Sequence, residues 1–252
     1  MKKVLAILFL VCLSATADLG RYDSATKHWE VDTGVLKCTF FQGCMYPAWF
    51  KRADNAEFPF FVFADNIVHD KITAYLREER WATFRVVENT ALRFIIECNG
   101  NFCYGKSPFN KPDSNVEAIY RYEFERGSGE VALMVTLRKK SGVIYDVELC
   151  SLRWRYLPFE RYGELDLKKN LPLNEDLKAE TARLSHPSMD LWIGDHPVIL
   201  RREPENSTFF YEENPFLYLK DATGRQKWPA ASTELQFETR LCFGNTPQEE
   251  NK

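Results

Sequence analysis

The chain of 252 residues carries a formal net charge of −3, and 45% of its residues are hydrophobic and 14% aromatic. This composition supports a sizeable buried core, and the charge gives no reason to expect a nucleic acid or an anionic membrane as a partner. At the start of the chain, Lys2 and Lys3 precede an apolar run over residues 4–13, and small residues follow up to Ala17. The pattern predicts a signal peptide over residues 1–17, and therefore a secreted or periplasmic protein.

The mature part is expected to form a single β-sandwich domain over residues 18–244. A polar tail over residues 245–252 contains Pro247 and is expected to be disordered. No later run approaches the roughly 18 apolar residues that a membrane-spanning helix needs, so no membrane span is expected.

Short runs with alternating apolar and polar residues, separated by turn residues, dominate the rest of the chain, and this pattern is typical of β-strands. Helical patterns are confined to two short segments, 65–76 and 174–184. About a dozen strands with so little helix predict an all-β fold of packed antiparallel sheets. The expected strands are 29–32, 35–41, 58–64, 81–88, 91–98, 118–125, 131–138, 143–156, 188–193, 198–201, 216–219 and 234–243.

Six cysteines remain after removal of the signal peptide, and an even number in an exported protein is typical of disulfides. Their close spacing suggests the local pairs Cys38 with Cys44 and Cys98 with Cys103, which leaves Cys150 for Cys242. Six cysteines allow 15 pairings, so other connectivities stay open. A zinc site is the alternative, but there is no C-x-x-C and no histidine at ligand spacing, so no metal is expected.

No nucleophile elbow, zinc-protease motif or phosphate-binding loop occurs, and we expect no cofactor. Histidine offers a proton carrier near neutral pH, and His186 and His196 flank a short apolar run. If that run is a strand, the two histidines lie at its opposite ends. The alternative for each is a surface or structural role.

A run of arginines and aromatics forms the second candidate site, for substrate binding. Arg153 and Arg155 alternate with Trp154 and Tyr156, so in a strand the two kinds of side chain point to opposite faces. Guanidinium groups suit the carboxylates of uronic acids, and aromatic faces suit sugar rings. The alternative is a core-facing aromatic pair with solvated arginines.

Two carboxylates near the end of the chain form the third candidate. Glu234 and Glu238 are four residues apart and share a face of a strand, where one of them could act as a general base. The alternative is that both are solvated strand residues.

Several of these strand patterns resemble a known family. The hairpin over residues 29–40, the segments 86–97 and 120–124, and the strands 131–137 and 234–243 are similar to galactose mutarotase-like domains. Segment 86–97 also resembles secreted polysaccharide lyases of the exo-rhamnogalacturonan lyase type. The resemblance implies a two-sheet antiparallel supersandwich with few short helices. It also implies that His186 supplies an active-site imidazole and that Glu234 or Glu238 supplies a late catalytic carboxylate.

The resulting hypothesis is a secreted domain that binds or processes carbohydrate, with an anionic, uronate-containing polysaccharide as the expected partner. The lyases of this type are longer and carry further domains, which favours a stand-alone binding or accessory domain, or a reduced enzyme. A sugar epimerase or polysaccharide lyase is the first alternative, and a non-catalytic structural envelope protein is the second.

Overall fold

The structure of the chain is a computed structural model. The backbone is described for residues 17–52, 57–59, 62–69, 72–76, 82–104, 113–140, 142, 146–154, 161–162, 165–166, 188–193, 196–203, 209–213, 217–221 and 226–243. Within these ranges, side chains are described mainly in residues 17–52, 82–104, 114–140 and 228–243. The predicted signal peptide, apart from Ala17, and the predicted tail lie outside the described residues.

Every regular element in the described part of the chain is a β-strand, and every strand pairing is antiparallel. The first ten strands are β1 (Gly20–Asp23), β2 (His28–Asp32), β3 (Leu36–Phe41), β4 (Trp49–Arg52), β5 (Glu57–Pro59), β6 (Val62–His69), β7 (Ile72–Leu76), β8 (Thr83–Asn89), β9 (Arg93–Tyr104) and β10 (Asp113–Glu125). The others are β11 (Glu130–Lys139), β12 (Val147–Trp154), β13 (Arg161–Tyr162), β14 (Leu165–Asp166), β15 (Ser188–Ile193), β16 (His196–Glu203), β17 (Phe209–Glu213), β18 (Leu217–Asp221), β19 (Gln226–Trp228) and β20 (Glu234–Cys242).

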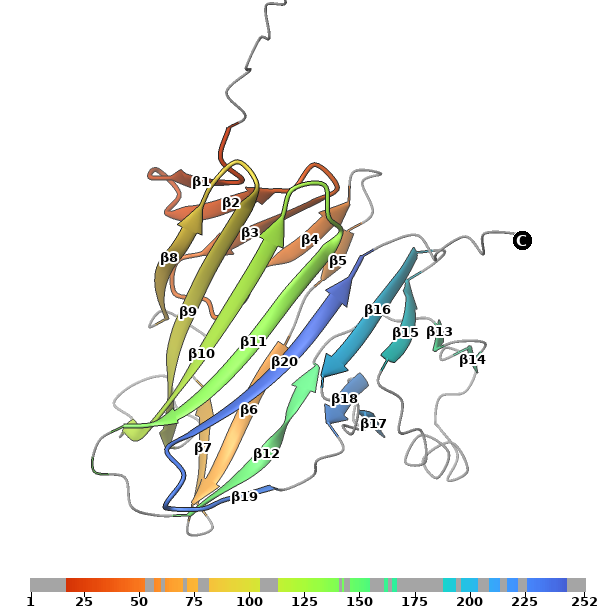
Figure 1. Ribbon diagram of the computed structural model, residues 1–252. Helices are drawn as coiled ribbons and strands as arrows, with labels where there is room; N and C mark the ends of the chain where they lie inside the picture. The colour runs from red at the N-terminus through yellow and green to blue at the C-terminus, as the bar shows by residue number, and fades with distance from the viewer. Residues whose placement is uncertain are drawn as a thin grey trace, which may run out of the picture.

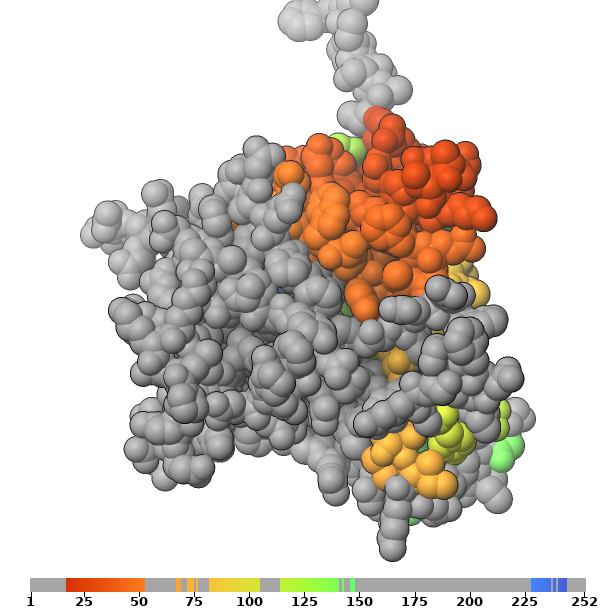
Figure 2. All heavy atoms as spheres, turned by 180° about the vertical axis from the view of Figure 1, so that it is seen from behind, coloured from red at the N-terminus to blue at the C-terminus, as the bar shows by residue number. Residues whose placement is uncertain are grey.

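The strands form two sheets of unequal size. Strands β1 to β5 pair in chain order to make the small sheet, and the other strands make one large sheet (Figure 1). Seen from behind, residues 17–52 form the surface over one end of the large sheet (Figure 2). The predicted two-sheet antiparallel architecture is therefore confirmed.

The long strand β9 organises the large sheet. Its first half, from Phe94 to Asn99, pairs with β8, and its second half, from Phe102 to Tyr104, pairs with β7. On its other side it pairs with β10, which continues through β11 and β20 to β16. Beyond β7 the sheet continues through β6 to β12 and curls, as Figure 1 shows.

The core lies between the two sheets and follows the two-residue period of the strands. The ring of Phe40 on β3 is fully buried, with its centroid 5.1 Å from that of Tyr122 and 6.0 Å from that of Phe124 on β10. The hydroxyl of Tyr122 donates a hydrogen bond to the carbonyl of Met45 over 3.1 Å, which ties the segment after β3 to the large sheet. The core therefore joins the small sheet to the inner face of β9 and β10.

A tight turn sets the start of β3. The side chain of Asp32 accepts a hydrogen bond from the N–H of Gly34, whose φ of 90° is a conformation that glycine adopts without a steric cost. The hydroxyl of Thr33 donates to the carbonyl of Ser128 over 2.7 Å, which links this turn to the turn between β10 and β11. The turn falls between the predicted strands 29–32 and 35–41, and its contact with Ser128 ties the small sheet to the large one.

One predicted helix is wrong. Residues 65–76 were expected to form a short helix, but 65–69 lie in β6 and 72–76 in β7, and these strands pair with each other, with Asn66 opposite Tyr75 and His69 opposite Ile72. Pairing of these two strands satisfies their backbone hydrogen bonds within the large sheet, and tertiary context of this kind overrides a weak local pattern. The other predicted helix, over residues 174–184, lies outside the described residues. In the described part of the chain no helix is long and apolar enough to cross a membrane.

Two neighbouring phenylalanines on β3 provide a test of this packing. Phe40 is 0% exposed, whereas the adjacent Phe41 is 42% exposed and points away from the core. We expect Phe40→Ala to lower the free energy of unfolding by about 3–5 kcal/mol, because it leaves a cavity between the sheets. We expect Phe41→Ala to cost less than about 1 kcal/mol. Urea unfolding of both variants measures this difference, and equal losses would contradict the packing described.

Candidate functional site

The outer face of the large sheet is strongly polar. Inner and outer side chains alternate along β9 and β10, so Phe94, Ile96 and Cys98 face the core while Arg93 and Glu97 face outward. The same alternation continues on β11 and β20. We call this surface the arginine–glutamate face. Its charged members in the described residues are Arg85, Glu88, Arg93, Glu97, Glu117, Arg121, Glu123, Glu130, Arg138, Glu234, Glu238 and Arg240.

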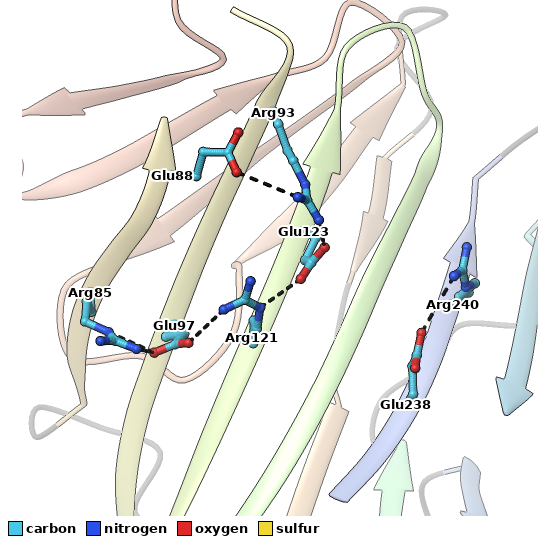
Figure 3. A network of polar contacts seen from close by, with 8 residues as sticks. All are labelled: Arg85, Glu88, Arg93, Glu97, Arg121, Glu123, Glu238 and Arg240. Atoms are coloured by element: carbon cyan, nitrogen blue, oxygen red, sulfur yellow. Dashed lines mark hydrogen bonds and ion pairs between the residues drawn. The ribbon is translucent and has the colours of Figure 1, made fainter. Parts of the chain in front are cut away.

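One half of this face is a continuous network across β8, β9 and β10 (Figure 3). The carboxylate of Glu97 accepts hydrogen bonds from Arg85 Nε over 2.9 Å and from Arg121 Nη1 over 3.1 Å. Arg121 Nε also donates to Glu123 over 2.8 Å, and Glu123 accepts a further hydrogen bond from Arg93. The side chain of Glu97 is only 11% exposed and lies between its two arginine partners.

These contacts keep the carboxylate of Glu123 ionised. Burial by itself would raise the pKa of Glu123, but the hydrogen bonds from Arg121 and Arg93 outweigh it and lower that pKa below its usual value. A carboxylate held in this way is a poor proton donor near neutral pH. This half of the face therefore suits cross-strand stabilisation better than acid–base chemistry.

On the other half of the face, formed by β11 and β20, the glutamates are more exposed: Glu234 and Glu238 are each 35% exposed, against 11% for Glu97 and 24% for Glu123. Arg138 Nε donates to Glu234 over 3.0 Å, and the amide of Gln236 donates to the same carboxylate over 2.8 Å. Arg240 Nη1 donates to Glu130 over 2.9 Å, and Arg240 lies 3.7 Å from Glu238. We call Arg138, Glu234, Gln236, Glu238 and Arg240 the open strip. The side chains of its two arginines are 46% and 43% exposed.

The open strip includes both carboxylates that the sequence analysis selected. Glu234 and Glu238 lie on the same face of β20, as predicted, opposite Arg138 and Met134 on β11. Four residues along a strand span about 13 Å. Glu234 hydrogen-bonds with Arg138 and Gln236, whereas Glu238 lies beside Arg240, so the two carboxylates have different partners.

The other predicted site residues lie elsewhere in the sheet. Arg153 and Trp154 are the last two residues of β12, and five strands stand between β12 and β20 in the order of the large sheet. His196 begins β16, seven residues along that strand from Glu203, the residue that pairs with Glu238. That separation is about 23 Å. His186, Arg155 and Tyr156 lie outside the described residues, as do the side chains of Arg153, Trp154 and His196.

The network around Glu97 and Arg121 was not predicted from the sequence. A signal for it was present, because Arg121 and Glu123 alternate with buried tyrosines on β10. What a single strand could not reveal is the register that brings Glu97 beside Arg121. Cross-strand partners depend on pairing between segments that are distant in sequence.

A second polar cluster lies on the β1–β2 hairpin. The Nδ1 atom of His28 lies 2.5 Å from the hydroxyl of Thr26, and Nε2 lies 3.2 Å from Glu30, which also binds Arg21. The hydroxyl, imidazole and carboxylate lie in the same order as a catalytic nucleophile, its base and the group that orients the base. Both ring nitrogens of His28 are already bonded, however, and neither is left to face a substrate. These contacts stabilise the β1–β2 hairpin.

The predicted local disulfides are not formed. The structure shows no disulfide among the cysteines whose side chains it describes, which are Cys38, Cys44, Cys98, Cys103 and Cys242. Cys98 and Cys103 lie five residues apart on the single strand β9, which separates their Cα atoms by about 17 Å, far beyond the reach of a disulfide. Close spacing in sequence was therefore misleading here, because the segment is extended. The side chain of Cys150 lies outside the described residues, so its pairing with Cys242 stays a prediction.

Among the described residues, no group of three or more histidines, cysteines, aspartates and glutamates could hold a metal ion.

Glu97 and Glu88 provide a matched test of the network. Glu97 joins two arginines and is mostly covered, whereas Glu88 makes a single 3.7 Å contact with Arg93 and is 35% exposed. We expect Glu97→Gln to lower the free energy of unfolding by about 1–3 kcal/mol, because the partly buried Arg121 and the more exposed Arg85 lose their shared carboxylate. We expect Glu88→Gln to change it by less than about 0.5 kcal/mol. Urea unfolding compares the two, and an equal effect would show that the network adds nothing.

No protein-family model matches the sequence, and no curated protein sequence matches it. Solved structures with the same fold do exist. An alpha-mannosidase from Enterococcus faecalis V583 matches with a TM-score of 0.54 and 10% identity, over 92% of this chain and 30% of the mannosidase chain. The GH36 alpha-galactosidase AgaB from Geobacillus stearothermophilus matches with a TM-score of 0.56 and 12% identity, over 90% of this chain and 41% of the galactosidase chain. The chain thus spans less than half the length of either enzyme chain and shares the fold of a β part of each.

Proposed function

We propose that this protein is a carbohydrate-related β domain that binds glycan on the open strip of its large sheet. The single observation that carries the proposal is the open strip itself, whose exposed guanidinium, carboxylate and amide groups lie together on the outer face of the large sheet. The fold likeness to parts of a mannosidase and a galactosidase supports a role with carbohydrate. The expected location outside the cytoplasm belongs to the same proposal.

The chemistry of the open strip suits hydroxyl-rich ligands. Carboxylates accept hydrogen bonds from sugar hydroxyls, and guanidinium and amide groups donate to hydroxyl and ring oxygens. Glu234 and Gln236 are already oriented by hydrogen bonds with their neighbours, which lowers the entropy cost of binding. The strip is therefore suited to a ligand that carries both donors and acceptors.

The charges of the open strip distinguish between neutral and anionic glycans as ligands. Within the open strip, Arg138 and Arg240 each contact two carboxylates, with Glu117 and Glu130 as the additional partners. Acidic groups therefore outnumber basic ones around the described arginines, which favours a neutral glycan over a polyanion. A uronate polymer was the ligand expected from Arg153 and Arg155, and the side chains of these two arginines lie outside the described residues.

A catalytic role rests on His186 and on a late carboxylate, and it remains the alternative. Glu234 and Glu238 face outward with arginine neighbours. This arrangement favours binding over proton transfer at these two positions.

Binding to the open strip is tested with two arginines that are each paired with a glutamate. Arg138 lies in the strip, while Arg21 lies on β1 and pairs with Glu30. We expect a glycan array that covers neutral and uronate polymers to identify a neutral ligand. For that ligand, we expect Arg138→Ala to weaken binding about tenfold, because a charge-assisted hydrogen bond is lost. Arg21→Ala should leave binding unchanged.

Calorimetric titration of both variants gives the comparison. No array signal above background, or equal weakening by the two substitutions, would contradict binding at the strip. A signal confined to uronate polymers would contradict the neutral preference and restore the original expectation.

A further inference from the structure

Three cysteines lie at the contact between the two sheets. Cys38 is on β3, Cys44 is on the connection from β3 to β4, and Cys98 is on the inner face of β9. Cys38 and Cys98 belong to the buried core, and Cys98 pairs across the sheet with Phe84 and Tyr120. Two separate segments of the fold thus bring thiols to one region of the core.

The residues on either side of Cys44 are both anchored next to Cys98. Gly43 forms a β-bridge with Ala82, the residue before Thr83, and Thr83 pairs with Asn99. On the other side, the sulfur of Met45 lies so close to Gly100 that a Cβ there would be 2.7 Å from it. Asn99 and Gly100 directly follow Cys98 on β9. The backbone of Cys44 is therefore held over the part of β9 that carries Cys98.

The hydroxyl of Tyr122 provides a further constraint. It donates to the carbonyl of Met45 over 3.1 Å, and Tyr122 lies on β10 directly beside β9. The pKa of the Cys98 thiol agrees with a position of Cys44 close to Cys98. Burial raises the pKa of the Cys98 thiol well above its usual value, and Cys44 makes the largest contribution of any neighbouring group to that rise.

From these contacts, we propose that Cys44 and Cys98, which the structure shows without a disulfide, form one on oxidation, and that this bond joins the connection after β3 to the large sheet. The inference concerns the covalent structure, and it does not depend on the proposed glycan binding. It also differs from the local pairs expected from sequence spacing, because it crosses the contact between the two sheets.

The oxidation requires a disulfide oxidant, such as glutathione disulfide. One cysteine attacks the oxidant as a thiolate to form a mixed disulfide, and one glutathione thiol leaves. The second cysteine then attacks the mixed disulfide and releases the second glutathione. In total the two thiols lose two electrons and two protons, and the oxidant gains them as its S–S bond breaks. Because Cys98 is fully buried, we expect the bond to form during folding, before the sheets pack.

The cross-link closes a long stretch of chain between positions 44 and 98. Closure of a loop this long restricts the unfolded chain, which stabilises the folded protein. We expect the oxidised protein to melt roughly 5–15 °C above the same protein after reduction.

Peptide mapping tests the proposal on the full chain. The reduced protein is unfolded, refolded with glutathione disulfide, alkylated and digested with trypsin without reduction. Trypsin releases Cys38 and Cys44 together in peptide 38–51, and Cys98 and Cys103 together in peptide 94–106. We expect mass spectrometry to detect these two peptides joined by one disulfide and to lose the joined species after reduction.

Four variants assign the bond. Cys44→Ala and Cys98→Ala should abolish the joined peptides and the oxidation-dependent rise in melting temperature. The matched controls Cys38→Ala and Cys103→Ala should keep both. Cys44 is only partly buried, so its variant is expected to fold even if substitution of Cys98 disrupts the core. Absence of the joined peptides in the unsubstituted protein, or their loss in Cys38→Ala and survival in Cys44→Ala, would overturn the proposal.

Discussion

Phe40 of the small sheet packs against Tyr122 and Phe124 of the large sheet, and the rest of the structure depends on this contact. It requires the aromatic side chains of β10 to point inward together. Because side chains alternate along a strand, Arg121 and Glu123 must then point outward. A slip of one residue in the pairing of β9 with β10 would bury the charges and expose the aromatics. The same interaction therefore sets both the core and the polar surface.

The polar surface divides into two halves with different properties. Around Glu97 the arginines and glutamates cover one another, and their hydrogen bonds leave little capacity for a ligand. Around Arg138 and Arg240 the glutamates are more exposed, at 35% for Glu234 and Glu238 against 11% for Glu97 and 24% for Glu123. The network on β8, β9 and β10 stabilises the sheet, so β11 and β20 can present a rigid surface. A rigid polar surface favours a binding role over a catalytic one.

Strand patterns in the sequence predicted the architecture well where one face of a strand is buried. The alternation in β10 and β11 matches their burial, and these strands lie near the centre of the large sheet. Residues 65–76 were predicted wrongly, because pairing with neighbouring strands decided their structure. Glu234 and Glu238 were correctly placed on one face. Their arginine partners were not predicted, because Arg138 comes from a strand almost a hundred residues away.

The disulfides illustrate the same limit. Proximity in sequence pointed to Cys98 and Cys103, but an extended strand separates them. Proximity in space instead brings Cys98 toward Cys44, through contacts of Met45 and Tyr122 that no local pattern contains. Both the covalent structure and the binding surface are thus properties of strand register, which long-range pairing determines.

The central claim is that the outer face of β11 and β20 is a glycan-binding surface. The most direct measurement is a titration of the isotope-labelled protein with the glycan selected on the array, followed by NMR of the backbone and side-chain amides. The account predicts that the largest shifts fall on Arg138, Glu234, Gln236, Glu238 and Arg240, with the side-chain amide of Gln236 among them. Shifts centred on the β1–β2 hairpin, or no saturable shifts on β11 and β20, would contradict it.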